Sequence, residues 1–197
     1  MPVGERQRLI TKILSVVLDE PAQVDVKFNW FINQHQIEHF KSSFQIIDKI
    51  YIDLKGNNLV KKVQSLQSDA YFGGRYNFLF EFDEIQHFSS ARLKSLNNYP
   101  PTLKVNYSIA DWKNWCVTYS SKADTYRFNK TTKDFDFKGG RTCQRAYLDC
   151  FRDILPQHNG LNPTLRIADF EVKGIFTFDS NSVNKVKKLI EKKMIFL

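Results

Sequence analysis

Few cysteines occur in the sequence, and their arrangement excludes two kinds of stapled scaffold. The chain of 197 residues has three, Cys116, Cys143 and Cys150, and none of them forms a C-x-x-C pair. An odd number without that pair indicates neither a disulfide framework nor a zinc site. Cys143 and Cys150 stand on a helical stretch, which predicts that they share a buried face. A chain of this length can bury a hydrophobic core large enough for folding without disulfides or a structural metal.

Long apolar runs are also missing. No stretch approaches the roughly 18 to 20 apolar residues that cross a bilayer. The start, MPVGERQRLITKIL, lacks the apolar core and small-residue cleavage site of a secretory leader. Hydrophobic residues make up 42% of the chain and charged residues 25%, which excludes a disordered protein. We therefore expect one globular domain that lies in the cytoplasm and not in a membrane.

Acidic residues are in the minority. The chain has 29 Lys or Arg against 21 Asp or Glu, which leaves a net charge of +8. Most of the excess lies between residues 88 and 141, where ten Lys or Arg face four Asp. Such an excess favours a polyanionic partner, although charge alone does not separate nucleic acid from an acidic membrane surface.

The hydrophobic pattern predicts helices and strands that combine into an α/β fold. Apolar residues recur at helical spacing over Glu5–Leu18, and alternation predicts a half-buried strand over Val24–Trp30. We expect a mixed central sheet flanked by helices. The remaining elements follow from periodicity and turn residues: a hairpin of Ile46–Leu54 with Leu59–Leu66, a second hairpin across Gly73-Gly74 into a strand over Tyr76–Asp83, a helix over Thr142–Leu155, a strand over Thr164–Phe170, and a last helix over residues 183–193.

The middle of the chain, from Phe88 to Arg141, has no clear periodicity. Tyr99-Pro100-Pro101 and Gly139-Gly140 interrupt it, as they would in irregular or separately folded chain. We interpret residues 88–141 as an insertion into the single domain.

Two carboxylates at the end of an apolar strand are the main candidates for chemistry. Glu81 and Asp83 are two residues apart, so a strand directs both to one face. Their repulsion is costly unless a divalent cation or a bound proton relieves it, and hard oxygen ligands suit magnesium or manganese. A solvated edge strand would explain the same spacing.

These acids belong to a segment that resembles a nuclease signature. Glu81-Phe-Asp83-Glu-Ile-Gln86-His87 is similar to the E-x-D-G-x-Q-H motif of a branch of the PD-(D/E)XK nuclease superfamily, the one that contains very-short-patch-repair-like endonucleases. Asp149-Cys-Phe-Arg152-Asp153 and the later Leu165-Arg166 resemble the D-x-x-R-D helix and the L-R strand of that branch. Glu84 stands where the branch has glycine. The resemblance covers the outer parts of the chain and skips the middle.

The resemblance implies a restriction-endonuclease-like core and a set of site residues. Its catalytic residues would be Asp69, Glu81, Asp83, Gln86 and His87, of which the three acids would hold Mg²⁺, or Mn²⁺ in its place. His87 would act as a base or phosphate donor, and Gln86 would donate to the phosphate or orient water. Asp149, Arg152 and Arg166 would support the acids or contact a phosphate, whereas a simple intrahelical pair is the alternative for Asp149 and Arg152.

The first acid of the motif has two candidates. A two-residue turn at Gly73-Gly74 would place Asp69 opposite Phe78, so that Glu81 would lie on the other face. A bulge or a longer loop is therefore needed to bring Asp69 to Glu81. Asp53 remains the alternative.

The basic middle region would then contact nucleic acid. Basic residues interleaved with aromatic ones suit phosphates together with bases or sugars. The expected contacts are Arg92, Lys94, Lys104, Lys113, Lys122, Arg127, Lys130, Lys133, Lys138, Arg141, Trp112 and Trp115.

Together these features predict a magnesium-dependent endonuclease acting on double-stranded DNA. A type II restriction enzyme that cuts as a homodimer is the leading hypothesis, because the compact core with one insertion leaves room for sequence-specific contacts. A mismatch-directed nicking repair endonuclease and a catalytically inactive nucleic-acid-binding module of the same fold are the alternatives, and RNA stays open as a substrate.

Overall fold

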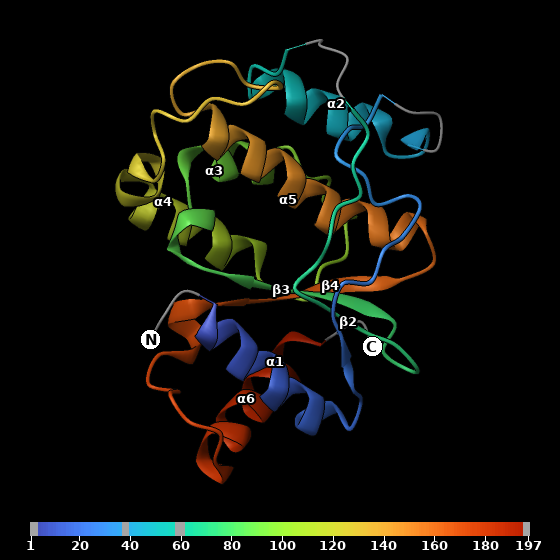
Figure 1. Ribbon diagram of the computed structural model, residues 1–197, viewed down its shortest axis with the longest axis vertical. Coiled ribbons are helices and arrows are strands. Elements are labelled where there is room, and N and C mark those ends of the chain that lie inside the picture. Colours follow the sequence, from blue (N-terminus) through green and yellow to red (C-terminus); the bar gives the residue numbers. More distant parts are fainter. Residues whose placement is uncertain (1–3, 37–39, 58–61, 195–197) are drawn as a thin grey trace.

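One mixed sheet with helices on both faces forms the protein, as the computed structural model shows for residues 4–36, 40–57 and 62–194 (Figure 1). The strands lie in the order β1-β2-β3-β4, with β1–β2 and β2–β3 antiparallel and β3–β4 parallel. The expected α/β fold with a mixed central sheet is therefore confirmed. The strands are β1 (Ala22–Gln23), β2 (Ala70–Phe72), β3 (Phe78–Asp83) and β4 (Asn162–Ala168).

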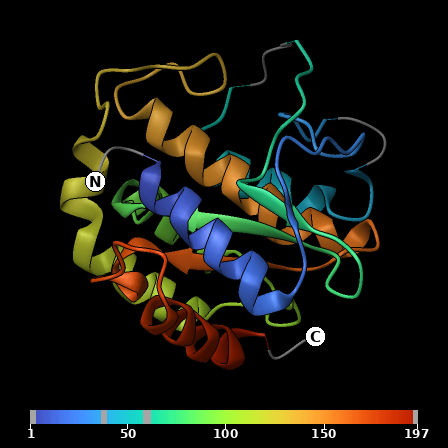
Figure 2. The same cartoon turned by 60° about the horizontal axis from the view of Figure 1, so that its bottom comes forward.

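The helices form a layer on each side of the sheet. On one side lie α1 (Glu5–Leu18) and α6 (Ser180–Lys193), which pack against each other. The other side carries α2 (Phe44–Asp53), α3 (Ser90–Asn97), α4 (Ile109–Thr125) and α5 (Gly140–His158), and Figure 2 shows the same two layers after a turn of the molecule. Short 3₁₀ helices follow two strands, η2 (Ile85–His87) after β3 and η3 (Asp169–Val172) after β4.

The connection between β2 and β3 is longer than a tight turn. Phe72 pairs with Phe78 and Ala70 pairs with Phe80, so residues 73–77 form the loop. The longer loop that the alignment of the acids required is therefore present. By this register Asp69, one residue before Ala70, comes level with Glu81, one residue after Phe80.

Side chains of β3 alternate between the two layers, as a strand requires. Phe78, Phe80 and Phe82 pack with the apolar residues of α1 and α6, whereas Leu79 packs with those of α2 to α5. Glu81 and Asp83 follow Leu79 at steps of two. The expectation that both carboxylates share one face of the strand is confirmed, and that face is the one covered by α5.

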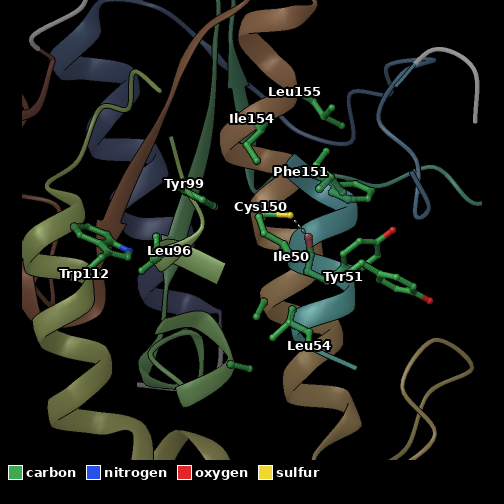
Figure 3. Close-up of a cluster of buried hydrophobic side chains, with 14 of the residues drawn as sticks. Ile50, Tyr51, Leu54, Leu96, Tyr99, Trp112, Cys150, Phe151, Ile154 and Leu155 are labelled. Carbon is green, nitrogen blue, oxygen red and sulfur yellow. Dashed lines mark hydrogen bonds between the residues drawn. The ribbon is translucent and has the colours of Figure 1, made fainter. Parts of the chain in front are cut away.

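Helix α2 packs against helix α5 through a large apolar cluster (Figure 3). Ile50 and Tyr51 of α2 pack with Phe151 and Ile154 of α5, and all four are buried. The three cysteines are free thiols, and both Cys143 and Cys150 pack against this cluster, as the helical spacing predicted.

Three predicted strands do not form where the structure describes the chain. Only Ala22–Gln23 pairs with β2, and residues 24–30 continue without strand structure. Residues 46–53 belong to helix α2, so the first predicted hairpin is wrong. The short apolar run fits either period, and packing of its buried residues against α5 favours the helix. Of the second arm of that hairpin, residues 58–61 lie outside the described residues, and Ser65 forms only an isolated bridge with Ile32.

The basic middle region is largely helical and contributes to the core. It contains α3 and α4, although its sequence lacks clear periodicity. Its residues Phe88, Trp112 and Phe135 are buried in the same cluster as α5. Across the part of the chain that the structure describes, no helix is both long enough and apolar enough to cross a membrane.

Candidate active site

A polar pocket of about 300 Å³ lies where β3 ends beside the first turns of α5. Four of the five predicted catalytic residues line it: Asp69, Glu81, Gln86 and His87. Gln7 of α1 and Glu84 complete one side, and α5 contributes Arg141, Arg145, Leu148, Asp149 and Arg152. The pocket therefore collects residues from four separate parts of the sequence.

Asp69 is held at the pocket by the neighbouring strand. Its Oδ2 accepts a hydrogen bond of 2.7 Å from the main-chain N–H of Phe82. Burial raises the pKa of Asp69, against the effect of this hydrogen bond and of the Arg152 guanidinium. The other candidate, Asp53, is exposed at the end of α2 and accepts a hydrogen bond from Asn98. Of the two candidates, only Asp69 lines the pocket.

Glu81 is a buried carboxylate with an incomplete set of partners. Its side chain is 6% exposed, and its Oε1 lies 2.9 Å from Nε of Arg152. Neither of these two atoms makes a well-directed hydrogen bond with the described residues, so the contact is an ion pair without hydrogen-bond geometry. Burial raises the pKa of Glu81 well above its usual range; Arg152 opposes this rise, and the charge of Asp69 adds to it.

His87 is oriented by a carboxylate of α5. Its Nδ1 lies 2.9 Å from Oδ2 of Asp149 and 3.5 Å from Oδ1 of Asp83. An ionised carboxylate only accepts, so Nδ1 carries the proton and Nε2 of a neutral ring is left as an acceptor. Although burial acts to raise the pKa of Asp149, contact with His87 and the charge of Arg166 lower it well below the usual range.

Gln86 is tied to the residue that departs from the family motif. Its side-chain amide donates a 2.6 Å hydrogen bond to Glu84, and the main-chain carbonyl of Gln86 accepts one of 3.2 Å from Arg145. Glu84 has a φ of −74°, an extended conformation that does not require glycine. Glutamate at this position therefore leaves the backbone unstrained, and its carboxylate holds the Gln86 amide.

Asp83 shares the strand face of Glu81 but does not line the pocket. Its two oxygens accept hydrogen bonds from Arg166 at 2.7 Å and from the Trp112 indole at 2.9 Å. Both Asp83 and Arg166 are buried. Asp83 therefore lies beneath the pocket, where its charge is already paired, and only Asp69 and Glu81 of the three expected metal ligands reach the pocket wall.

Of the expected supporting residues, the two arginines contact the acids, and Asp149 contacts His87. Arg166 pairs with Asp83 and also donates a 2.7 Å hydrogen bond to Asp153. Arg152 reaches Glu81 and lies 3.8 Å from Asp149, so the intrahelical pair exists beside the contact to the strand acid.

Two of the residues expected to contact DNA are buried instead. Arg92 donates a 2.6 Å hydrogen bond to Asp153 and one of 2.8 Å to the Tyr99 hydroxyl, and it is 1% exposed. Trp112 is buried above Asp83. Charge counting assigns an arginine to the surface, but a buried arginine is stable when a carboxylate pairs with it. Neither residue is a surface contact.

The other expected DNA contacts reach the surface to differing extents. Trp115 is half-buried against Phe88 and Phe170. Arg141 is half-buried at the pocket. Lys113 is half-buried on α4, and the exposed residues are Lys94, Lys104, Lys122, Arg127, Lys130, Lys133 and Lys138.

Arg145 is the principal pocket residue that the sequence motifs did not predict. It lies one helical turn before Asp149, and Arg141 lies one turn before Arg145. Residues 141, 145, 149 and 152 therefore repeat at steps of four, four and three, which directs them to one face of α5. Helical spacing counted back from Asp149 and Arg152 would therefore have predicted that Arg141 and Arg145 share their face of the helix.

Two carboxylates of the pocket, those of Asp69 and Glu81, are ligands of the kind that magnesium takes. Within the described ranges, no group of three or more His, Cys, Asp or Glu side chains gathers closely enough to hold a metal ion. Magnesium, however, is often bound by one or two carboxylates together with waters and substrate phosphates. Asp69 and Glu81 supply two such groups, and the unsatisfied Oε1 of Glu81 is an oxygen of the required kind.

Comparisons with protein-family models, with curated proteins and with solved structures found no match for the chain. The nuclease resemblance therefore depends on the motif residues themselves. Their function must be inferred from where the fold places them, and it places Asp69, Glu81, Gln86 and His87 around one pocket.

Proposed function

We propose that the chain is a divalent-metal-dependent DNA endonuclease that hydrolyses phosphodiester bonds. The observation that supports this most directly is the meeting of Asp69 and Glu81, from the paired β2–β3 region, with Gln86 and His87 in one pocket. Arg141 and Arg145 lie in the same wall. Carboxylates can bind a cation and arginines can bind phosphates, so the two together suit phosphoryl chemistry.

Asp69 and Glu81 would hold the cation. A bound magnesium ion would supply Lewis acidity and neutralise charge on the phosphate. Burial raises the pKa of both carboxylates, and the charge of Asp69 raises the pKa of Glu81 further. A cation held by both carboxylates would relieve this cost of ionisation.

His87 would act as the general base that accepts a proton from the attacking water. Asp149 holds Nδ1, so Nε2 is the nitrogen that accepts a proton from water as the water oxygen bonds to phosphorus. The imidazolium that results is stabilised by the Asp149 carboxylate. The leaving oxygen departs with the shared electron pair and takes a proton from solvent. Gln86 lies beside His87 and would orient the phosphate or the water.

One contact favours a second candidate, a DNA-binding module without catalysis. The Arg152 guanidinium touches Glu81 and provides the positive charge that a metal would otherwise supply. If Arg152 holds this position permanently, the acids are neutralised and no cation enters. The two candidates differ in whether metal addition moves Arg152 away from Glu81.

Among endonucleases, we favour a type II restriction enzyme acting as a homodimer on double-stranded DNA. Symmetric cleavage of both strands is commonly achieved by a two-fold dimer, because matching centres then face the two strands. The exposed basic residues between 88 and 141 would supply the DNA contacts.

The test is incubation of the protein with unmodified plasmid and long duplex DNA in magnesium, in manganese and in chelator, read on a gel. Discrete double-strand fragments that depend on the metal are expected. Nicked circles confined to mismatched DNA would indicate a repair nickase instead. Tight binding without cleavage in either metal would favour the inactive module. Absence of both binding and cleavage would refute the proposal.

A further inference from the structure

Three arginines beside the pocket have no acidic partner. Arg127 precedes the irregular segment that leads to α5, and Arg141 and Arg145 lie in the first turns of that helix. Among the described residues, none of the three forms an ion pair, whereas Arg92, Arg152 and Arg166 each pair with a carboxylate. The fold therefore gathers positive charge here without neutralising it.

The three arginines are close enough to act on one another. The guanidiniums of Arg127 and Arg145 lie over the ring of Tyr126, with centroid distances of 5.3 and 5.2 Å. Burial lowers the pKa of Arg141, and the nearby charge of Arg127 lowers it further. Burial likewise lowers the pKa of Arg145. The charge of Asp149 opposes this decrease, and the charge of Arg141 adds to it. Such mutual repulsion is relieved when an anion binds among the arginines.

The backbone holds the cluster in place. Gly139 N–H donates to the Phe128 carbonyl at 2.7 Å, and Arg141 N–H donates to the Lys130 carbonyl at 3.1 Å, so residues 127–130 are tied to the start of α5. Arg127 itself has a φ of +54°, the left-handed region that non-glycine residues seldom adopt. A strained conformation held by neighbouring hydrogen bonds is a feature that often accompanies ligand sites.

The carboxylate that acts on both Arg141 and Arg145 does not neutralise the cluster. Asp149 is the carboxylate that acts on both Arg141 and Arg145, but it contacts His87 at 2.9 Å. The other polar contacts are uncharged or main-chain: Arg141 donates to the Gln144 side chain, and Arg145 donates to the Gln86 carbonyl. The link from Arg145 to Gln86 places the cluster directly beside the predicted catalytic segment.

We propose that Arg127, Arg141 and Arg145, the first and last of which contact the Tyr126 ring, bind a backbone phosphate of the nucleic acid next to the bond that is cleaved. This inference rests on the proposed nuclease function and assigns its substrate a second point of attachment. Arginine suits this role because its planar fork donates two hydrogen bonds to one phosphate. Arg127 and Arg145 keep their contacts with Tyr126 while their N–H groups face the anion.

The experiment measures binding of a labelled duplex oligonucleotide in chelator, where no cleavage occurs, for wild type, Arg127→Asn, Arg141→Ala, Arg145→Ala and Arg145→Lys. Asn tolerates the left-handed backbone at residue 127, so that variant tests the charge without disturbing the fold. We expect Arg141→Ala and Arg145→Ala each to weaken binding roughly tenfold or more. Each lost contact should also reduce the slope of log affinity against log salt by about 0.9. Arg145→Lys should restore the slope but only part of the affinity.

The matched control is Lys185→Ala with Lys188→Ala, two exposed lysines on α6 that do not line the pocket. Their removal should leave the salt slope of specific binding unchanged. The inference would be overturned if the lysine control lost as much affinity as the arginine variants, or if the arginine variants kept wild-type affinity and salt slope. It would also be overturned if the protein bound none of three oligonucleotides of the same sequence: duplex DNA, single-stranded DNA and RNA. The three oligonucleotides identify which nucleic acid supplies the phosphate.

Failure of the inference is distinguishable from failure of the proposed function. If wild type cleaves DNA but the arginine variants retain both KM and kcat, the nuclease stands and the phosphate site is refuted. If the arginine variants lose affinity while wild type cuts nothing in magnesium or manganese, the phosphate site stands and catalysis is refuted. If both hold, the arginine variants raise KM, whereas changes at Glu81 lower kcat.

Discussion

The carboxylate of Asp69 accepts a 2.7 Å hydrogen bond from the main-chain N–H of Phe82, across the register between the β2 segment and β3. Phe82 follows Glu81 directly, so this bond holds the two candidate metal ligands side by side. The predicted first acid thus reaches the second through a loop longer than the Gly73-Gly74 turn alone.

Removal of either acid should abolish cleavage without weakening DNA binding. We expect Asp69→Asn and Glu81→Gln to lose at least about a hundredfold in kcat, because each removes a ligand whose cation stabilises charge at the phosphate. DNA affinity should stay equal or rise, since a negative charge beside phosphate is lost. Single-turnover cleavage and binding in chelator measure the two effects. Asp53→Asn is the control, and full activity in Glu81→Gln would refute the site.

Magnesium should stabilise the folded protein through the same two acids. A ligand that binds only the folded state adds about 2.7 kcal/mol when present at a hundred times its dissociation constant. We expect magnesium to raise the Tm of the wild type and to leave that of Glu81→Gln unchanged. Because burial raises the pKa of Glu81, its neutral replacement should also unfold at an equal or higher temperature without metal. A magnesium shift that persists in Glu81→Gln would place the cation elsewhere.

Asp153 should be essential for stability at neutral pH. It accepts hydrogen bonds from Arg92 at 2.6 Å and from Arg166 at 2.7 Å, and all three groups are buried. Although burial acts to raise the pKa of Asp153, the charges of Arg166 and Arg92 outweigh it and lower the pKa. Asp153→Asn leaves two buried arginines short of a counter-charge, which should cost about 3–5 kcal/mol in the free energy of unfolding.

The pH dependence of that cost has a defined sign. A carboxyl whose folded pKa is lowered stabilises the protein above its unfolded pKa of about 3.9, and this stabilisation is lost as pH falls through the folded pKa. Urea unfolding should therefore show a large difference between wild type and Asp153→Asn at pH 7 that shrinks towards pH 3. Asp136→Asn, at an exposed position, is the control and should change little at either pH. An Asp153→Asn difference independent of pH would contradict the ion-pair account.

Gly140 should not tolerate a side chain. A Cβ at this position would overlap the carbonyl oxygen of Phe135, which is main chain and cannot move aside alone. We expect Gly140→Ala to destabilise the fold by about 1–3 kcal/mol and to shift the start of α5, and with it Arg141 and Arg145. Gly160→Ala is an instructive comparison, because its Cβ would meet no atom within 4 Å and its φ of +77° alone causes strain. Thermal unfolding of both variants measures the difference, and an unaffected Gly140→Ala would contradict the packing.

Local pattern determined several elements on its own. Periodicity predicted α1 with the bounds Glu5 and Leu18 that the structure has, and it predicted α5, α6 and the apolar β3. The spacing of Glu81 and Asp83 placed both on one strand face, because strand periodicity is a property of the backbone. Of the five catalytic residues that the motif resemblance implied, four line one pocket.

Tertiary packing decided what the local pattern left open. Residues 46–53 form a helix because α5 offers a surface for one helical face, and the β-branched content of the segment does not overrule that contact. Arg92 is buried on Asp153, whereas Arg127 is exposed and forms no ion pair with the residues that the structure describes, although the sequence presents both as basic residues of one region. Asp83 is paired beneath the pocket because the side chain of Arg166, which lies level with Glu81 on the neighbouring strand β4, reaches its carboxylate. Charge, burial and partner are properties of the assembled fold, since each depends on residues that are distant in the sequence and close only after folding.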